Sequence, residues 1–254
     1  MAGEAAAFDG ASEQFLSHYG QVRGHVRLRI TQNNLVGHLM PGALEVLDYQ
    51  GGAGHDTIWI ASMGDRPTLL EESPKMFEAA ETNIKEQKAN IRSRIKLLPG
   101  NLEELPEDAS FDVILSHGVL MYELGDPQGQ LDALASRLKE RGILSLLTKG
   151  KVAASSQVKE EDLAGFKQTA RYVNRLGRPA RAYEFDELEA MLAIAGLSPV
   201  ARYGVRLLSD DDQRSIDEVP DRELEHIVST EIEAGSDPAL MDRGQMLHVI
   251  ARKE

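Results

Sequence analysis

The chain has 254 residues, of which 42% are hydrophobic, and its formal net charge is −13. This length and composition allow one large hydrophobic core, and the acidity argues against a general coat for DNA or RNA, because phosphate contacts need lysine and arginine. The chain has no cysteine and only seven scattered histidines, which excludes disulfides and thiolate metal sites and predicts no metal ion.

Neither a membrane span nor a secretion signal is expected. The apolar stretches fall short of the roughly 20 residues that cross a bilayer. Residues 1–10 lack a basic flank and an apolar core, so they do not resemble a signal peptide. We therefore expect a cytoplasmic protein with no membrane partner, and we expect residues 1–10 to fray.

Hydrophobic periodicity predicts an α/β chain in which strands and helices alternate. The expected strands are short and apolar, as in a parallel sheet covered on both faces, and they lie at 44–49, 67–71, 94–98, 111–116, 142–148, 199–207 and 245–252. The expected helices lie at 15–40, 55–63, 74–88, 127–139, 185–195 and 221–233. Ser73 followed by Pro74 predicts a helix start, since serine is a favoured N-cap and proline suits the first helical position.

This pattern predicts a single domain over residues 1–254. A helical cap at 11–40 precedes the sheet, and helical insertions are expected at 150–183 and 208–244. The sequence holds no internal repeat and no low-complexity linker that would divide it.

A Gly-rich turn joins the first expected strand to the helix after it. The turn reads Asp48-Tyr-Gln-Gly-Gly-Ala-Gly54. Glycine lets a ligand approach the backbone closely at a helix N-terminus, and ligands of open α/β sheets lie at the carboxyl ends of the strands. The turn is therefore the first candidate for a binding site, against the alternative of a tight connection with no ligand.

Positions after the next two strands favour a nucleoside as the ligand. Glu71 ends the second expected strand, where a carboxylate can accept hydrogen bonds from both hydroxyls of a ribose. Glu72 competes for that role, and Glu71 could instead serve the dipole of the following helix. Asn101 and Leu102 follow the third strand, where an amide side chain and a backbone N–H can face an adenine. The dinucleotide NAD is disfavoured, since Thr57 stands where G-x-G-x-x-G requires its third glycine.

These residues make the chain resemble the class I S-adenosylmethionine-dependent methyltransferases. Val46-Leu-Asp48 with the Gly-rich turn is similar to their first motif, and Glu71-Glu-Ser-Pro-Lys-Met76 is similar to their D-x-S-P-x-M stretch. The resemblance implies a Rossmann-like, doubly wound sheet of seven strands, mostly parallel with an antiparallel last strand. It also implies S-adenosyl-L-methionine as the cofactor. The cofactor-binding residues that it implies are Asp48, Gln50, Gly51, Gly52, Gly54, Glu71, Glu72, Met76, Asn101, Leu102, Ser116 and His117.

A closer resemblance, over nearly the whole chain, is to the tRNA 5-carboxymethoxyuridine methyltransferases, which esterify a carboxylate on a wobble uridine. It rests on four short pieces, which are Tyr19-Gly20 with Arg23-Gly24 and Arg27, Ser116-His117-Gly-Val-Leu120, Gly204-Val-Arg206, and His248-Val-Ile-Ala-Arg-Lys253. This resemblance implies a tRNA anticodon loop as the partner.

The chain departs from the family pattern at several positions. Gln50 replaces the leading glycine of the first motif, where its side chain would crowd the methionine end of the cofactor or tilt the turn. Glu71 and Asn101 stand where aspartate is usual. Thr148-Lys149-Gly150 replaces an aromatic residue and asparagine near the expected substrate pocket, which leaves the acceptor open.

A carboxylate acceptor is already ionised at pH 7, so its methylation requires a cation to position it and no general base. We expect Arg206 to bind the substrate, with Lys149 as a further cation nearby. Arg23 or Arg27, four residues apart on one helix face, is expected to bind the carboxylate of the cofactor. His117 is expected to shape the pocket or to act as a base, against the alternative of an ordinary hydrogen-bonded loop histidine. The expected catalytic residues are thus Arg206 and His117.

The segment Arg171–Arg181 is the best nucleic-acid signal. It holds four arginines in eleven residues, with Tyr172 inside it and Tyr183 close by. Arginine for phosphates and tyrosine for stacking on unpaired bases would suit an anticodon loop, whereas the alternative is a solvated helix. Two other functions stay open: a methyltransferase for a small metabolite, and a non-catalytic module that binds the cofactor.

Overall fold

The structure is a computed structural model that describes residues 16–254. The expected fraying of residues 1–10 and the expected first part of the helical cap, residues 11–15, lie outside the described residues. No helix in the described part is long and apolar enough to cross a membrane.

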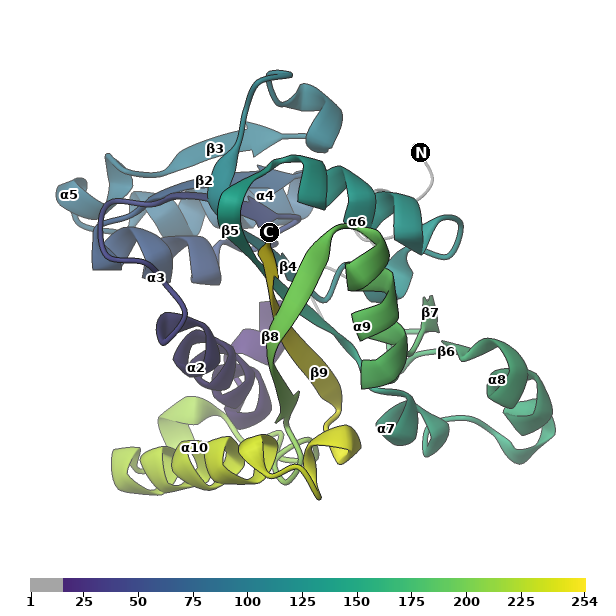
Figure 1. Cartoon of the computed structure of the whole chain (residues 1–254). Coiled ribbons are helices and arrows are strands. Elements are labelled where there is room, and N and C mark those ends of the chain that lie inside the picture. The colour runs from purple at the N-terminus through teal and green to yellow at the C-terminus, as the bar shows by residue number, and fades with distance from the viewer. Residues whose placement is uncertain (1–15) are drawn as a thin grey trace.

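A seven-stranded sheet runs through the centre of the molecule (Figure 1). Its order is β3-β2-β1-β4-β5-β9-β8, and β9 is antiparallel to both of its neighbours while all other pairs are parallel. This confirms the doubly wound, mostly parallel sheet expected from the sequence. The strands are β1 Glu45–Tyr49, β2 Arg66–Glu71, β3 Lys96–Pro99, β4 Phe111–His117, β5 Leu138–Lys149, β8 Leu197–Val205 and β9 Met246–Lys253.

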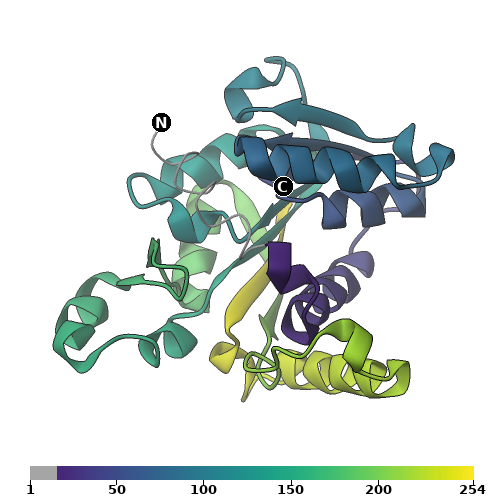
Figure 2. The same cartoon turned by 180° about the vertical axis from the view of Figure 1, so that it is seen from behind.

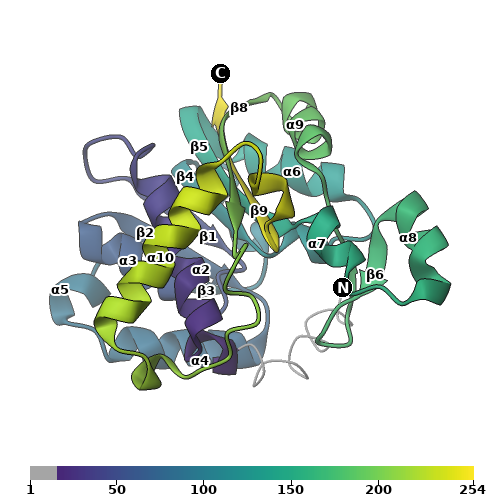
Figure 3. The same ribbon diagram turned by 90° about the horizontal axis from the view of Figure 1, so that it is seen from below.

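Helices cover both faces of the sheet (Figures 1 and 2). Apolar residues of α6 and α9 pack on one face, and those of α2 and α3 pack on the other. Figure 3 shows α10 lying along α2, and α10 also contacts β8. The longer helices are α2 Val22–Val36, α3 His55–Met63, α4 Pro74–Lys85, α6 Pro127–Ser136, α9 Phe185–Ile194 and α10 Asp221–Ser236. The shorter ones are α5 Ala89–Arg92, α7 Lys151–Ser155 and α8 Leu163–Thr169.

The side chains of β4 show why the strands had to be apolar on both faces. Ile114 belongs to the cluster under α6 and α9, whereas Val113 and Leu115 belong to the cluster under α2 and α3. Successive side chains of a strand point to opposite faces, so a strand covered on both sides buries apolar side chains of both sets. The start of α4 is also as expected, because the Ser73 side chain accepts a hydrogen bond from the Met76 N–H and Pro74 takes the first helical position.

The insertion expected to be helical at 150–183 is only partly so. After α7 and α8 the chain forms a hairpin of β6 Arg171–Val173 and β7 Pro179–Arg181, which projects from the body of the protein (Figure 2). Pro179 disfavours helix at the residue before it, and Gly177 adopts a positive φ of 71° that turns the chain. The Gly177 N–H donates to the Asn174 carbonyl across this turn at 2.9 Å.

Two expected helices have different bounds. The expected helix at 15–40 is interrupted at Gly20–Gln21, where Gln21 bridges to Ser215, and α2 then begins at Val22. A Cβ at Gly24 would lie 1.8 Å from the His18 carbonyl oxygen, so glycine permits the two segments to meet. The helix expected at 127–139 ends at Ser136, because the chain enters β5, whose first residue Leu138 pairs with Phe111.

We predict that the turn after β1 tolerates no side chain at Gly51. A Cβ there would lie 2.3 Å from Leu69 Cδ1 and 2.4 Å from the Asp48 carboxylate, both buried. Gly51→Ala should lower the free energy of unfolding by about 1–3 kcal/mol through overpacking. The measurement is urea unfolding.

Gly165→Ala is the matched control. Gly165 lies inside α8 and a Cβ there meets nothing within 4 Å, so alanine should be neutral or should stabilise by roughly 0.5–1 kcal/mol. Equal stability of the two variants would contradict the close approach at Gly51.

Candidate active site

A cavity of about 620 Å³ opens at the carboxyl ends of β1, β2, β4 and β5. This edge includes the switch point between β1 and β4, where α/β sheets bind ligands. The cavity brings together most of the expected site residues, which are Arg23, Arg27, Asp48, Gln50, Gly51, Gly52, Glu71, Glu72, Met76, Asn101, Leu102, His117, Lys149 and Arg206. Gly54 and Ser116 do not line it. Gly54 is instead the N-cap of α3, with a φ of 78°, and Ser116 is fully buried.

Glu71 ties the Gly-rich turn to the start of α4. Its carboxylate accepts hydrogen bonds from the Gly52 N–H at 2.8 Å and from the Ser73 N–H at 2.8 Å, one on each oxygen. Each oxygen keeps a further lone pair that can accept a hydroxyl. Burial raises the pKa of Glu71 to about 7, although these two hydrogen bonds lower it.

Gln50 is held against the ends of β2 and β3. Its side-chain amide donates to the Gly100 carbonyl at 3.2 Å, and its amide oxygen accepts from the Glu72 N–H at 3.1 Å. Its own N–H donates to the Leu70 carbonyl at 2.7 Å. These bonds stabilise a backbone with φ of 53°, a conformation that favours the glycine usually found here. The Gln50 side chain therefore points toward the ends of β2 and β3.

Two acids beneath the turn have opposite pKa shifts. Asp48 accepts a hydrogen bond from the Thr57 hydroxyl at 2.6 Å, and burial together with the neighbouring Asp56 raises the pKa of Asp48. Burial also opposes ionisation of Asp56, but its hydrogen bond with His117 and the charge of Arg27 hold the pKa of Asp56 below its usual value. Asp56 is thus the ionised partner of His117.

A buried chain of hydrogen bonds fixes His117. Asn34 Nδ2 donates to His248 Nδ1 at 3.3 Å, so His248 Nε2 carries the proton and donates to Ser145 Oγ at 2.8 Å. The Ser145 hydroxyl then donates to His117 Nε2 at 2.8 Å, and His117 Nδ1 donates to Asp56 at 3.0 Å. Burial lowers the pKa of His248 well below its usual value, which keeps that ring neutral. Both ring nitrogens of His117 are therefore engaged within the protein, and the geometry favours a structural role over that of a base.

The two arginines of α2 that line the cavity, Arg23 and Arg27, have different neighbours. The Arg27 guanidinium lies 5.4 Å from the centre of the Tyr19 ring, and the Tyr19 hydroxyl lies close to Gly52. Arg23 instead donates to Gln21 at 2.8 Å, and its charged neighbours are Asp210, Arg175 and Asp211. Arg27 is therefore the arginine beside the Gly-rich turn.

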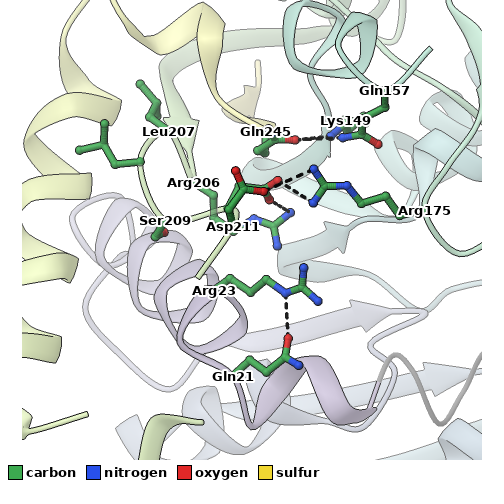
Figure 4. A network of polar contacts seen from close by, with 12 residues as sticks. Gln21, Arg23, Lys149, Gln157, Arg175, Arg206, Leu207, Ser209, Asp211 and Gln245 are labelled. Atoms are coloured by element: carbon green, nitrogen blue, oxygen red, sulfur yellow. Dashed lines mark hydrogen bonds and ion pairs between the residues drawn. The ribbon is translucent and has the colours of Figure 1, made fainter. Parts of the chain in front are cut away.

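Arg206 follows β8, which lies five strands away from β2 and Glu71 in the sheet, and it sits among other charged side chains (Figure 4). Its side chain is 15% exposed, its backbone φ is 56°, and it pairs with Asp210 at 3.2 Å. Asp210 also pairs with Arg175 of the hairpin at 3.1 Å. Burial, with the nearby charges of Arg27 and Arg23, lowers the pKa of Arg206 to about 10, so the side chain stays protonated at pH 7. Its Nε has no hydrogen-bond partner among residues 16–254.

A buried carboxylate from α10 holds the loop that carries Arg206 and Asp210. Glu231 is fully buried and accepts four hydrogen bonds of 2.6–2.9 Å, from the N–H groups of Leu207, Leu208 and Ser209 and from the Ser209 hydroxyl. Sequence reasoning missed Glu231, because its partners lie more than twenty residues away and no local pattern marks it.

The arginines of the segment Arg171–Arg181 have partners within the protein. Arg171 donates to the Leu124 carbonyl, Arg175 pairs with Asp210 and Asp211, Arg178 lies over the Tyr122 ring and Arg181 pairs with Glu187. Arg175, Arg178 and Tyr172 line the cavity. The segment thus forms a wall of the site as well as part of the surface.

The sheet order and the Gly-rich turn at its switch point define a Rossmann-like nucleoside-binding domain of the methyltransferase type. Residues 42–196 match the model of a methyltransferase domain family, which is more than half of the chain. The chain belongs to this family, and the resemblance to S-adenosylmethionine-dependent methyltransferases drawn from the sequence is confirmed.

Comparison with known proteins gives relatives of two kinds. The tRNA 5-carboxymethoxyuridine methyltransferase of Escherichia coli K12 is 28% identical over 146 residues, which is 55% of each chain. The ribosomal RNA small subunit methyltransferase J of Rhodopseudomonas palustris is 30% identical over 117 residues, covering 43% of this chain and 51% of the relative. The chain thus spans about half the length of the curated relatives that it matches.

Solved structures confirm the fold. A methyltransferase from Methanosarcina mazei has a TM-score of 0.63 and 17% identity, covering 87% of this chain and 96% of that one. The glycopeptide N-methyltransferase MtfA, complexed with S-adenosylhomocysteine, has a TM-score of 0.59 and 16% identity, covering 89% of each chain.

We predict that Glu231 is required for the loop that positions Arg206. Glu231→Gln replaces an acceptor with an amide whose N–H₂ faces backbone N–H groups, so the free energy of unfolding should fall by about 1–3 kcal/mol. Glu233→Gln, at an exposed position of the same helix, should change it by less than about 0.5 kcal/mol. Equal unfolding midpoints for the two variants in urea would show that the four hydrogen bonds are not needed.

Proposed function

We propose that this chain methylates a carboxylate with S-adenosylmethionine, and that the carboxylate belongs to 5-carboxymethoxyuridine at the wobble position of tRNA. The observation that carries the proposal is Arg206, a protonated and mostly covered arginine that follows β8, five strands away in the sheet from Glu71 at the end of β2. A guanidinium binds a carboxylate through two parallel hydrogen bonds, which places a nucleophilic oxygen without removing a proton.

The residues of the Gly-rich edge fit the cofactor. Glu71 keeps a lone pair on each oxygen for the two ribose hydroxyls, and Asn101 and Leu102 line the same end for the base. Gly52 lines the cavity without a side chain, which leaves room for the methionine portion, and Arg27 lies beside the turn for its carboxylate. When bound, S-adenosylmethionine supplies a methyl group activated by a sulfonium.

The arrangement of His117 supports an acceptor that needs no base. Its Nδ1 and Nε2 are held by Asp56 and Ser145, so neither nitrogen is free to take a proton from an acceptor. A hydroxyl or amine acceptor would require such a base, whereas a carboxylate is ionised at neutral pH. This favours a carboxylate over the small-metabolite acceptors that must lose a proton.

The tRNA part of the proposal rests on relatives. Proteins named for tRNA and rRNA methylation share 28–30% identity with part of this chain. Tyr122 and Tyr172 line the cavity beside the hairpin, where aromatic rings could contact an unstacked base. Because the chain as a whole is acidic, RNA would bind only at a local group of cations, such as the segment Arg171–Arg181.

We predict that affinity for S-adenosylhomocysteine, the demethylated cofactor, rises with pH through the pKa of Glu71. Ribose hydroxyls donate to the ionised carboxylate, so binding favours the deprotonated form and releases a proton at low pH. With a pKa of about 7, calorimetry should show affinity rising about fourfold from pH 6.5 to pH 8.

Two variants test which acid is responsible. Glu71→Gln should weaken binding about 10-fold or more and abolish its pH dependence, because a charged acceptor is lost. Glu72→Gln should still show affinity that rises with pH, displaced toward lower pH, because the charge of Glu72 helps to raise the pKa of Glu71. Loss of the pH dependence in Glu72→Gln but not in Glu71→Gln would assign the ribose contact to Glu72. If the wild-type protein does not bind S-adenosylhomocysteine at millimolar concentration, the cofactor assignment is wrong.

The acceptor is tested by transfer of a labelled methyl group to tRNA. We expect label in tRNA that contains 5-carboxymethoxyuridine and none in an unmodified transcript of the same sequence. Arg206→Met should lower kcat/KM for tRNA by about 10- to 100-fold, the loss of one charged hydrogen-bonding partner, with unchanged affinity for the demethylated cofactor. Arg202→Met, on β8 four residues before Arg206 and with a 43% exposed side chain, should retain activity. Labelling of small-molecule extracts but not of tRNA would favour the metabolite alternative.

A further inference from the structure

Lys149 is a buried amine that the proposed reaction leaves without a role. It is the last residue of β5, only 6% exposed, and it lines the cavity. Its Nζ donates to the Gln245 side chain at 2.6 Å, and Gln157 donates to the same oxygen at 3.3 Å. Figure 4 shows Lys149, Gln245 and Gln157 together beside Arg206. Burying an ammonium is costly, so a lysine at this place carries its charge fully only when an anion lies beside it.

Positive side chains outnumber negative ones around Lys149. The cations at this end of the cavity are Lys149 from β5, Arg206 after β8, Arg175 from the hairpin and Arg23 from α2 (Figure 4). The acids that face them are Asp210 and Asp211 in the loop after Arg206. When Lys149 is protonated, these four cations and two acids leave two positive charges in excess, within a chain of net charge −13. Arg27 and Glu231, which also interact with Arg206, add one charge of each sign and leave the excess unchanged.

This excess exceeds what one carboxylate would balance. A single acceptor carboxylate paired with Arg206 leaves one positive charge without a counterion whenever Lys149 is protonated. In a pyrimidine nucleotide, the C5 substituent and the 5′-phosphate lie on the same side of the base. A carboxylate attached at C5 and the phosphate of the same nucleotide can therefore enter one cluster of cations.

We propose that this end of the cavity binds two acid groups of one acceptor nucleotide, the carboxylate on Arg206 and the 5′-phosphate on a second position that includes Lys149. The inference rests on the proposed function for the identity of the acceptor. Asp210 holds Arg175 and Arg206 in place, and Lys149 adds the charge that distinguishes a nucleotide from its nucleoside.

Binding of the second acid group should be accompanied by uptake of a proton at Lys149. Burial, together with Arg206 and Arg175, lowers the pKa of Lys149 to about 7, while Asp210 raises it, and Gln245 and Gln157 are neutral. The amine is thus mostly neutral at pH 8 in the free protein. An anion placed beside it favours the charged form, so nearly one proton should enter the complex at that pH.

Calorimetry on the protein saturated with S-adenosylhomocysteine tests this inference. The probes are 5-carboxymethoxyuridine, its 5′-monophosphate and uridine 5′-monophosphate, each titrated at pH 8 in two buffers of different ionisation enthalpy. The carboxylated nucleotide should bind at least 10-fold tighter than either other probe and take up about one proton.

Lys149→Met should lower the affinity for the carboxylated nucleotide about 10-fold and abolish the proton uptake, with unchanged affinity for the nucleoside. Lys159→Met, at an exposed lysine, should match the wild-type protein in both respects. Binding of S-adenosylhomocysteine by each variant shows that the variant is folded.

Three results would overturn the inference: equal affinity for nucleoside and nucleotide, proton uptake that persists in Lys149→Met, or no binding of any probe. Failure of the proposed function is seen separately, in the tRNA assay. Tight nucleotide binding with proton uptake but no methyl transfer to tRNA would leave this inference standing and reject that acceptor. Methyl transfer to tRNA together with equal affinity for nucleoside and nucleotide would support the proposed acceptor and reject this inference.

Discussion

The paired hydrogen bonds of the Glu71 carboxylate connect the two segments on which the cofactor site depends. One oxygen holds the Gly52 N–H of the turn after β1, and the other holds the Ser73 N–H at the start of α4. The turn can approach this carboxylate only because Gly51 has no side chain to meet Leu69 and Asp48. The parallel pairing of β1 and β2 brings their carboxyl ends together. The Glu71 carboxylate then holds the turn after β1 against the start of α4. Its raised pKa follows from the same burial.

From this fixed edge the cavity runs toward a region of opposite charge. Acidic and amide groups line the end near Glu71, whereas arginine and lysine surround Arg206. A nucleoside needs hydrogen-bond acceptors and a carboxylate needs cations, so the two ends suit different parts of one reaction. Glu231 contributes from a distance, because it holds the loop on which Arg206 and Asp210 lie.

Much of the sheet and of the cofactor edge could be predicted from the sequence, because local patterns encode them. Apolar runs specify strands covered on both faces, the Ser73-Pro74 pair specifies a helix start, and the strand–glycine–helix order places a turn at the edge of the sheet. The sequence also placed Glu71 correctly at the end of β2. Local patterns failed at Arg171–Arg181, where an arginine-rich run was expected to be helical and forms a hairpin.

The acceptor end could not be predicted in this way, because its residues come from distant elements. The chain of hydrogen bonds that fixes His117 uses α2, α3, β5 and β9, and only tertiary structure brings these together. Likewise the excess of positive charge around Arg206 cannot be read from a chain whose net charge is strongly negative. The sequence indicated Arg206 and Lys149 separately, and the structure gives them a shared environment.

The chemical stability of the transferred methyl group tests the central claim most directly. Methylation of a carboxylate gives an ester, which mild alkali hydrolyses to methanol, whereas methyl groups on nitrogen, carbon or an ether oxygen resist the same treatment. The account predicts that tRNA labelled by this protein with a radioactive methyl group loses its label as volatile methanol in mild alkali, and that the acidic nucleoside is restored. Label that stays on the tRNA after this treatment would contradict the account.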